Sequence, residues 1–133
     1  MVCNQVKRKF RSERVPYETF QVPNKKGEKL SVIVFPRDFD TLPTVLYLHG
    51  NGGHKLEALH LAGSPINLIA FDFSACGKSE GEMLTYGENE VSDIEFVIKF
   101  AKERYRQPDL KLAIWGRSMG ASIALMYTSL HQN

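Results

Sequence analysis

A serine stands between two glycines in segment 116–120, which reads Gly-Arg-Ser-Met-Gly. It follows the apolar run 110–115 and opens a helical pattern. A nucleophile in a sharp turn from a strand into a helix has strained backbone angles, so the residues two before and two after it must be small. Gly116 and Gly120 meet this requirement. The segment therefore predicts that Ser118 is a nucleophile, with its hydroxyl exposed above a sheet and beside a helix N-terminus.

A second glycine-rich segment, residues 49–54, reads His-Gly-Asn-Gly-Gly-His and follows another apolar run. Gly50 and Gly52 free the backbone to turn its N–H groups toward a ligand. Acyl transfer by a serine needs such preorganised donors for the oxyanion that forms. We expect the N–H of Asn51 to be one donor and the N–H of Met119 to be the other. Considered alone, the segment also fits a flexible turn.

A third polar segment begins at Asp72. Its Gly-Lys-Ser sequence at 77–79 suggests a P-loop, but that motif needs a glycine five residues before its Gly-Lys pair, where this chain has Asp72. We therefore exclude nucleotide binding here and expect Asp72 and Ser79 to tie the loop to its own backbone. Cys76 is predicted to be a bystander thiol, because no base can be assigned to activate it.

These loops must be positioned by a sheet, and the sequence around them predicts one. Apolar or alternating runs indicate strands at residues 17–22, 30–35, 44–48, 67–71 and 110–115. The first two flank a polar turn ending in Gly27 and predict an antiparallel hairpin. The last three are apolar enough to be buried on both faces, as in a parallel sheet. Helical patterns between them predict an α/β fold with a mostly parallel sheet.

The clearest helical pattern covers residues 88–105, and a weaker one covers 55–62. Apolar residues recur on one face of the longer pattern, at Val91, Ile94, Ile98, Ala101 and Tyr105. We expect Thr85 and Glu88 to form a capping box at its start. Pro108 prevents its continuation.

The composition excludes several classes of protein. The 133 residues, 43% hydrophobic and 24% charged, are typical of one globular domain. A net charge of +2 is too small to suggest nucleic-acid binding. Two cysteines cannot form a disulfide framework, and neither a secretory leader nor a membrane-spanning run is seen, so we expect a cytoplasmic protein. No motif indicates a metal ion or a cofactor.

The expected domain covers residues 15–133 and follows a basic tail at 1–14. The tail holds Cys3 and a cluster of cations: Lys7, Arg8, Lys9, Arg11 and Arg14. Two interpretations are open, a solvated tail and an acylated, polybasic anchor that associates weakly with membranes. The solvated tail is favoured because one acyl chain alone anchors weakly.

With these motifs the sequence resembles the α/β-hydrolase superfamily, and most of all a cytosolic branch with serine aminopeptidase-like, monoglyceride-lipase-like and depalmitoylase-like members. The resemblance rests on residues 46–53, 71–81 and 116–121, which occur in the family's order and spacing. It implies acyl transfer to water, in which Ser118 attacks an ester, thioester or amide, a histidine acts as base, and an acid orients the histidine. The substrate implied is a small or lipid-derived acyl compound.

The chain departs from this family after segment 116–120, the predicted nucleophile elbow. In the family the acid and the histidine follow the nucleophile, but here only residues 121–133 follow Gly120. A crossover to another parallel strand alone takes roughly ten to twelve residues. We therefore expect an N-terminal part of the domain, truncated after the helix that follows Ser118, without the usual acid and base.

Other histidines are poor substitutes for the missing base. His131 lies thirteen helical residues beyond Ser118, which corresponds to roughly 20 Å. His54, oriented by Asp72, is an alternative that abandons the family's order of residues. His49 and His60 are expected to pack or to face water.

Two functions follow as alternatives: a serine hydrolase that is incomplete as given, and a non-catalytic interaction or regulatory module. In both cases strand 110–115 lacks a neighbour on one side. An unpaired apolar edge favours pairing with another chain, so we expect self-association.

Overall fold

The computed structural model describes residues 15–132. Its elements, in chain order, are β1 (Glu18–Pro23), β2 (Lys29–Phe35), β3 (Thr44–Leu48), η1 (Lys55–Leu61), β4 (Asn67–Phe71), α2 (Glu88–Arg104), β5 (Leu112–Gly116) and α3 (Met119–Leu130). η1 is a 3-10 helix. Every expected element is present, with ends shifted by at most about two residues, as is common for element boundaries. The expected basic tail and anchor at 1–14, with Cys3, lie outside the described residues.

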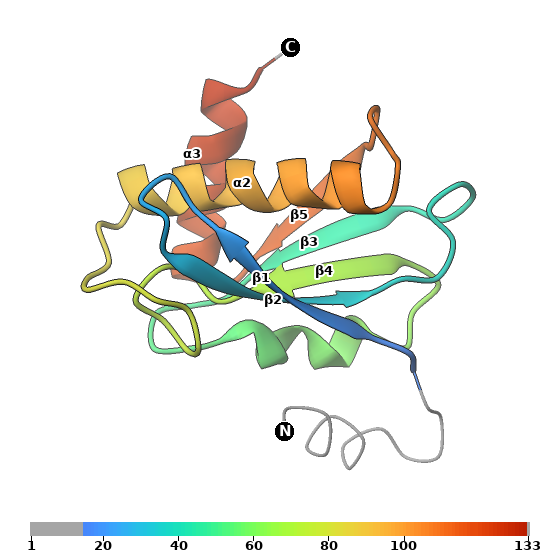
Figure 1. The fold of residues 1–133 in the computed structure, drawn as a ribbon, viewed down its shortest axis with the longest axis horizontal. Helices are drawn as coiled ribbons and strands as arrows, with labels where there is room; N and C mark the ends of the chain where they lie inside the picture. Colours follow the sequence, from blue (N-terminus) through green and yellow to red (C-terminus); the bar gives the residue numbers. More distant parts are fainter. Residues whose placement is uncertain (1–14, 133) are drawn as a thin grey trace.

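The strands form one twisted sheet in the order β1-β2-β4-β3-β5 (Figure 1). β1 and β2 form the expected antiparallel hairpin, and β2 also runs antiparallel to β4. β4, β3 and β5 are parallel to one another. The carboxyl ends of these parallel strands therefore lie on one side of the sheet, and the three loops singled out in the sequence begin there.

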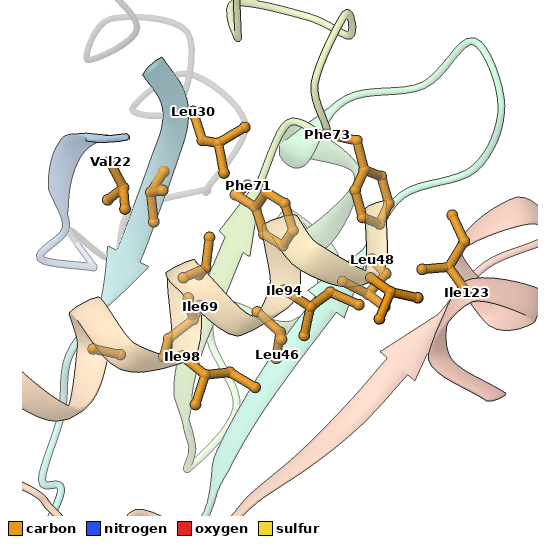
Figure 2. Packing of buried hydrophobic residues seen from close by; sticks show 14 of the residues in the cluster. Val22, Leu30, Leu46, Leu48, Ile69, Phe71, Phe73, Ile94, Ile98 and Ile123 are labelled. Carbon is orange, nitrogen blue, oxygen red and sulfur yellow. The ribbon is translucent and has the colours of Figure 1, made fainter. Parts of the chain in front are cut away.

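Helices cover both faces of the sheet (Figure 1). α2 and α3 pack on one face over a core to which Leu46, Phe71 and Ile94 belong (Figure 2). η1 packs on the other face over a second cluster that includes Ile33 and Tyr47. Within residues 15–132, no helix combines the length and the apolar character that crossing a membrane requires.

The three parallel strands differ in burial. β4 is buried along its whole length, as expected. β5 is not: its residues are partly or fully exposed, and Trp115 is 50% exposed. The expectation of burial on both faces is therefore wrong for this strand. The reason is position, because β5 pairs with β3 on one side and the described residues place no strand on the other.

A buried polar network ties the hairpin to the loop after β4 and to α2. The carboxylate of Asp93 accepts hydrogen bonds from the backbone N–H and the hydroxyl of Ser74, at 2.9 and 2.7 Å. The side-chain amide of Asn24 in the hairpin turn donates to Asp93 and to Ser74. Burial raises the pKa of Asp93 in spite of these bonds. Three segments distant in sequence are thereby fixed against one another.

The expected capping box of Thr85 and Glu88 is wrong. α2 begins at Glu88, so Gly87 is the N-cap and Glu90 is the third helical residue. The Glu90 carboxylate accepts from the backbone N–H groups of Thr85, Tyr86 and Gly87 at 2.8, 3.1 and 3.2 Å. The chain turns at Tyr86, with φ +55°, so Thr85 precedes the N-cap residue, although its hydroxyl still accepts from the backbone N–H of Asn89 at 3.0 Å. Burial opposes the charge on Glu90, but the hydrogen bonds from Thr85 prevail and lower its pKa.

We predict that Glu90→Ala lowers the free energy of unfolding by about 2 kcal/mol or more, because it leaves three backbone donors without their acceptor. The control Glu88→Ala removes an exposed carboxylate from the same turn and should change the free energy by less than about 0.5 kcal/mol. Urea denaturation measures both. Because the folded-state pKa of Glu90 is lowered, its contribution is present above its ordinary value of 4.5 and is lost as the pH falls through the lowered one. Equal effects of the two variants at pH 7 would contradict this assignment.

Candidate active site

Ser118 lies in the turn between β5 and α3, and its side chain is exposed. Its backbone has φ 51° and ψ −115°, a strained conformation for a residue with a Cβ. The ladder between β3 and β5 continues up to this turn, since Arg117 donates its N–H to the carbonyl of Leu48 at 3.0 Å. Ser118 is also the N-cap of α3. Its hydroxyl therefore stands at the positive end of a helix dipole.

The structure gives a steric reason for both flanking glycines. A Cβ on Gly120 would lie 2.2 Å from the carbonyl oxygen of Leu48 and 2.7 Å from that of His49. A Cβ on Gly116 would lie 2.4 Å from the carbonyl oxygen of Gly120. These contacts are with backbone atoms, which cannot give way as the end of a flexible side chain could. The sharp turn at Ser118 thus depends on glycine at both positions.

The loop after β3 lies directly beside this turn. A Cβ built on Gly50 would be 3.6 Å from the Cβ of Ser118. Residues 50–53 form a tight turn in which Gly53 donates its N–H to the carbonyl of Gly50 at 3.0 Å. Gly52 has φ +72° at the third position, as a type II turn requires. Asn51 is exposed at the tip of this turn.

His49 is buried and fixes the orientation of the peptide between Gly50 and Asn51. Its Nε2 accepts from the backbone N–H of Phe73 at 3.1 Å, so its Nδ1 carries the proton and donates to the carbonyl of Gly50 at 2.7 Å. That carbonyl thus accepts from His49 and from Gly53. Because C=O and N–H point in opposite directions in a trans peptide, the N–H of Asn51 points away from both donors. His49 packs, as expected, and is not free to act as a base.

Two backbone N–H groups in these turns, those of Met119 and Asn51, donate to no acceptor among the described residues. Met119 is the first residue of α3, so its N–H is among those that no carbonyl of the helix can accept. The N–H of Asn51 is oriented by the turn just described. This arrangement can stabilise negative charge that develops on an oxygen beside Ser118.

None of the chain's four histidines, all within residues 15–132, is hydrogen-bonded to Ser118. His54 accepts from the N–H of Leu56 and caps η1. His60 is exposed and is bonded to the carbonyl of Glu57. His131 stands at the far end of α3, with its Nε2 3.1 Å from a carboxylate oxygen of Glu95. The described part of the chain therefore places no base at Ser118.

Asp72 holds the third loop and does not orient His54. Its carboxylate accepts from the backbone N–H of Lys55 at 2.6 Å, from the Nζ of Lys55 at 2.9 Å, and from the backbone N–H of Lys78 at 2.9 Å. The hydroxyl of Ser79 donates to the carbonyl of Asp72. The structural role expected for Asp72 and Ser79 is confirmed. Lys55, which is buried, was missed by the sequence interpretation because a lysine at a helix start ordinarily faces water.

Cys76 belongs to the same loop and is buried. Burial, followed by the nearby carboxylates of Asp72, Glu90 and Asp93, raises the pKa of its thiol to about 11. It is therefore protonated at neutral pH and is not an activated nucleophile, in agreement with its expected role. Within residues 15–132, no three His, Cys, Asp or Glu side chains are grouped so that they could hold a metal ion.

A hollow between α2 and α3 lies away from Ser118 and includes none of the three loops. Its lining is mixed in charge, with Lys99, Lys102 and Arg106 beside Glu95 and Glu103. Such a lining favours neither an anion nor a cation. The geometry that can do chemistry is at the exposed turn of Ser118.

We predict that Gly120→Ala destabilises the chain by about 3 kcal/mol, in the range of overpacked sites, because the new methyl group meets the backbone of β3. Gly63→Ala is the matched control, since a Cβ on Gly63 meets nothing within 4 Å. It should change the free energy of unfolding by less than about 0.5 kcal/mol. Urea denaturation followed by circular dichroism measures both, and a neutral Gly120→Ala would be inconsistent with the close approach of α3 to β3.

Comparison with known proteins agrees with this geometry. Residues 43–133 match a family model described as the alpha/beta hydrolase fold. The chain is 33% identical over 88 residues to a lysophosphatidylserine lipase of Danio rerio, covering 62% of this chain and 22% of that protein. It is 30% identical over 124 residues to the uncharacterized protein YqkD of Bacillus subtilis, covering 90% of this chain and 40% of that one.

A solved structure has a similar arrangement of strands and helices. The esterase Pf2001 of Pyrococcus furiosus superposes with a TM-score of 0.72 and 29% sequence identity, over 89% of this chain and 46% of the esterase. The chain thus spans less than half the length of each of these relatives. The family match, the fold and the shared arrangement of strands and helices together show that the chain belongs to the α/β-hydrolase superfamily.

Proposed function

We propose that the chain is the N-terminal part of a serine hydrolase that cleaves an ester, thioester or amide through an acyl-enzyme on Ser118. The observation that carries the proposal is the strained turn of Ser118, at the N-terminus of α3 and beside the turn of residues 50–53. A strained backbone is retained where the surrounding structure enforces it, and such positions cluster at active sites.

The proposed chemistry follows from the groups around Ser118. Its Oγ attacks the acyl carbon, and the oxygen that becomes negative accepts hydrogen bonds from the N–H groups of Asn51 and Met119. The dipole of α3 favours the same charge. The proton of Oγ passes to a base, which then protonates the leaving group.

The base and its orienting acid are proposed to come from outside residues 15–132. In this fold both residues follow the nucleophile in the chain. The relatives are more than twice as long as the matched region, which leaves room for them there. No metal ion or cofactor takes part in the proposed mechanism.

The substrate class is proposed from the relatives. The Pyrococcus furiosus protein is an esterase and the Danio rerio protein is a lysophosphatidylserine lipase. Both names indicate carboxylic esters. We therefore propose a small or lipid-derived acyl ester as the substrate.

We predict that a fluorophosphonate probe at high concentration modifies Ser118 slowly, because the oxyanion donors retain part of the rate acceleration when the base is absent. Ser118→Ala should abolish the labelling. Ser122→Ala, which removes an exposed serine one turn further along α3, should leave it unchanged. Intact mass spectrometry and peptide mapping measure the site. Absence of labelling in a sample shown to be folded by circular dichroism would contradict the proposal.

A second candidate, a non-catalytic interaction module, is favoured by the open side of β5. Trp115 on this strand is 50% exposed, and Leu125 and Leu130 on the adjacent α3 are each 73% exposed. An unpaired strand beside apolar side chains offers both hydrogen bonds and apolar area to another chain.

We predict that the chain expressed alone self-associates through this edge. Analytical ultracentrifugation should show species larger than a monomer, and Trp115→Lys should shift them toward the monomer, because a lysine on an edge strand opposes pairing. Met83→Lys is the control, since Met83 is exposed but belongs to the loop before α2. A monodisperse wild-type monomer would contradict the prediction.

A further inference from the structure

The carboxylate of Glu57 lies where three parts of the candidate site meet. Its Oε2 accepts from the backbone N–H of Gly50 at 3.3 Å and from the hydroxyl of Tyr47 at 3.3 Å. Its Oε1 is 3.7 Å from the Nη1 of Arg117, the residue before Ser118. The side chain of Glu57 is only 18% exposed, whereas that of Arg117 is 67% exposed. A single acidic group thus joins the end of β3, the turn of residues 50–53 and the turn of Ser118.

The carboxylate of Glu57 explains why residue 53 is a glycine, which the backbone angles do not explain. Gly52 is required by its φ of +72°, but Gly53 does not have a positive φ. A Cβ on Gly53 would instead lie 1.9 Å from the Oε1 of Glu57 and 3.1 Å from the carbonyl oxygen of Gly50. Glycine at this position therefore leaves the space that the Glu57 carboxylate occupies.

The partners of Glu57 also account for its burial. A half-buried carboxylate is costly unless hydrogen bonds and a positive charge compensate for its lost hydration. The Gly50 N–H and the Tyr47 hydroxyl provide the hydrogen bonds, and Arg117 provides the charge. In return, the Gly50 N–H is held from one side while the Gly50 carbonyl is held by His49 and Gly53. Hydrogen bonds thus fix the peptide before Gly50 through its N–H and the peptide after Gly50 through its C=O.

We propose that Glu57 is a positioning residue of the oxyanion site: it holds the turn of residues 50–53 against the turn of Ser118. This inference rests on the proposed function of Ser118. Glu57 does not touch the reacting atoms. Its hydrogen bond to the Gly50 N–H positions the residue before Asn51. Its ion pair with Arg117 positions the residue before Ser118.

A double-mutant cycle on the full chain tests the inference. Gly53→Ala and Glu57→Ala should each slow fluorophosphonate modification of Ser118 by between about 10-fold and 100-fold, because a displacement of an oxyanion donor by a fraction of an ångström is costly in rate. If the alanine methyl acts by displacing the carboxylate, the double variant should be no slower than Glu57→Ala alone. Fully additive effects would overturn the inference.

A split of the rate constants separates positioning from general loss of structure. Gly53→Ala and Glu57→Ala should lower the limiting rate of modification. They should not change the probe concentration that gives half of that rate. Glu57→Gln keeps an acceptor for the Gly50 N–H but loses the attraction to Arg117, so it should be slowed less than Glu57→Ala. Gly63→Ala should react like the wild type. Thermal unfolding of each variant shows that it is folded.

A second readout does not depend on the reactivity of Ser118. In a ¹H–¹⁵N spectrum, the amide proton of Gly50 should lie downfield because it is bonded to a carboxylate, and it should move upfield in Glu57→Ala and in Gly53→Ala. An unmoved Gly50 signal in folded Glu57→Ala would overturn the contact and the inference with it. An unreactive Ser118 in the folded wild type would instead remove the proposed function. These two failures are therefore distinguishable.

Discussion

The close approach of two backbones, that of α3 at Gly120 and that of β3 at its carboxyl end, is the constraint on which the candidate site depends. The missing Cβ of Gly120 lets the first turn of the helix lie against the carbonyl groups of Leu48 and His49. The chain leaving β5 must then reverse within a few residues, and Ser118 takes a positive φ as a consequence. A side chain on Gly116 or Gly120 would widen the turn and move the serine away from the helix N-terminus.

Hydrogen bonds from buried polar side chains hold the loops around this turn in place. His49 spans from the loop after β3 to the loop after β4, with one ring nitrogen donating and the other accepting. Asp72 joins the start of η1 to the loop after β4 through Lys55 and Lys78. Each of these buried groups has defined partners, so the loops beside the turn of Ser118 are held in place without a ligand. Preorganisation of this kind is what makes backbone N–H groups effective at stabilising a transient charge.

The same architecture leaves one side of the molecule open. β5 carries the turn of Ser118, yet it is paired only through β3 within residues 15–132. Its neighbour α3 packs inward through Met119 and Ile123 and exposes Leu125 and Leu130. The turn of Ser118 therefore adjoins a part of the described structure that exposes large apolar side chains.

The sequence by itself determined the order and type of the elements, because apolar runs and helical periodicity are local features and each segment's pattern agreed with its type of element. It also identified the loops that meet at the carboxyl ends of the strands, since glycines at 116 and 120 have a steric meaning that spacing alone reveals. Tertiary structure decided what depends on residues distant in the chain. Glu90, and not the expected Glu88, accepts from the backbone N–H groups before α2, because its carboxylate reaches back over a bend at Tyr86. No local pattern distinguishes Lys55 and Glu57 from solvated charges in a short helix. Only the packing of η1 beside Asp72 and Arg117 makes Lys55 a buried partner and Glu57 a partly buried one. A local pattern shows which residues are polar. The fold decides which polar groups are removed from water and must therefore form hydrogen bonds or ion pairs with one another.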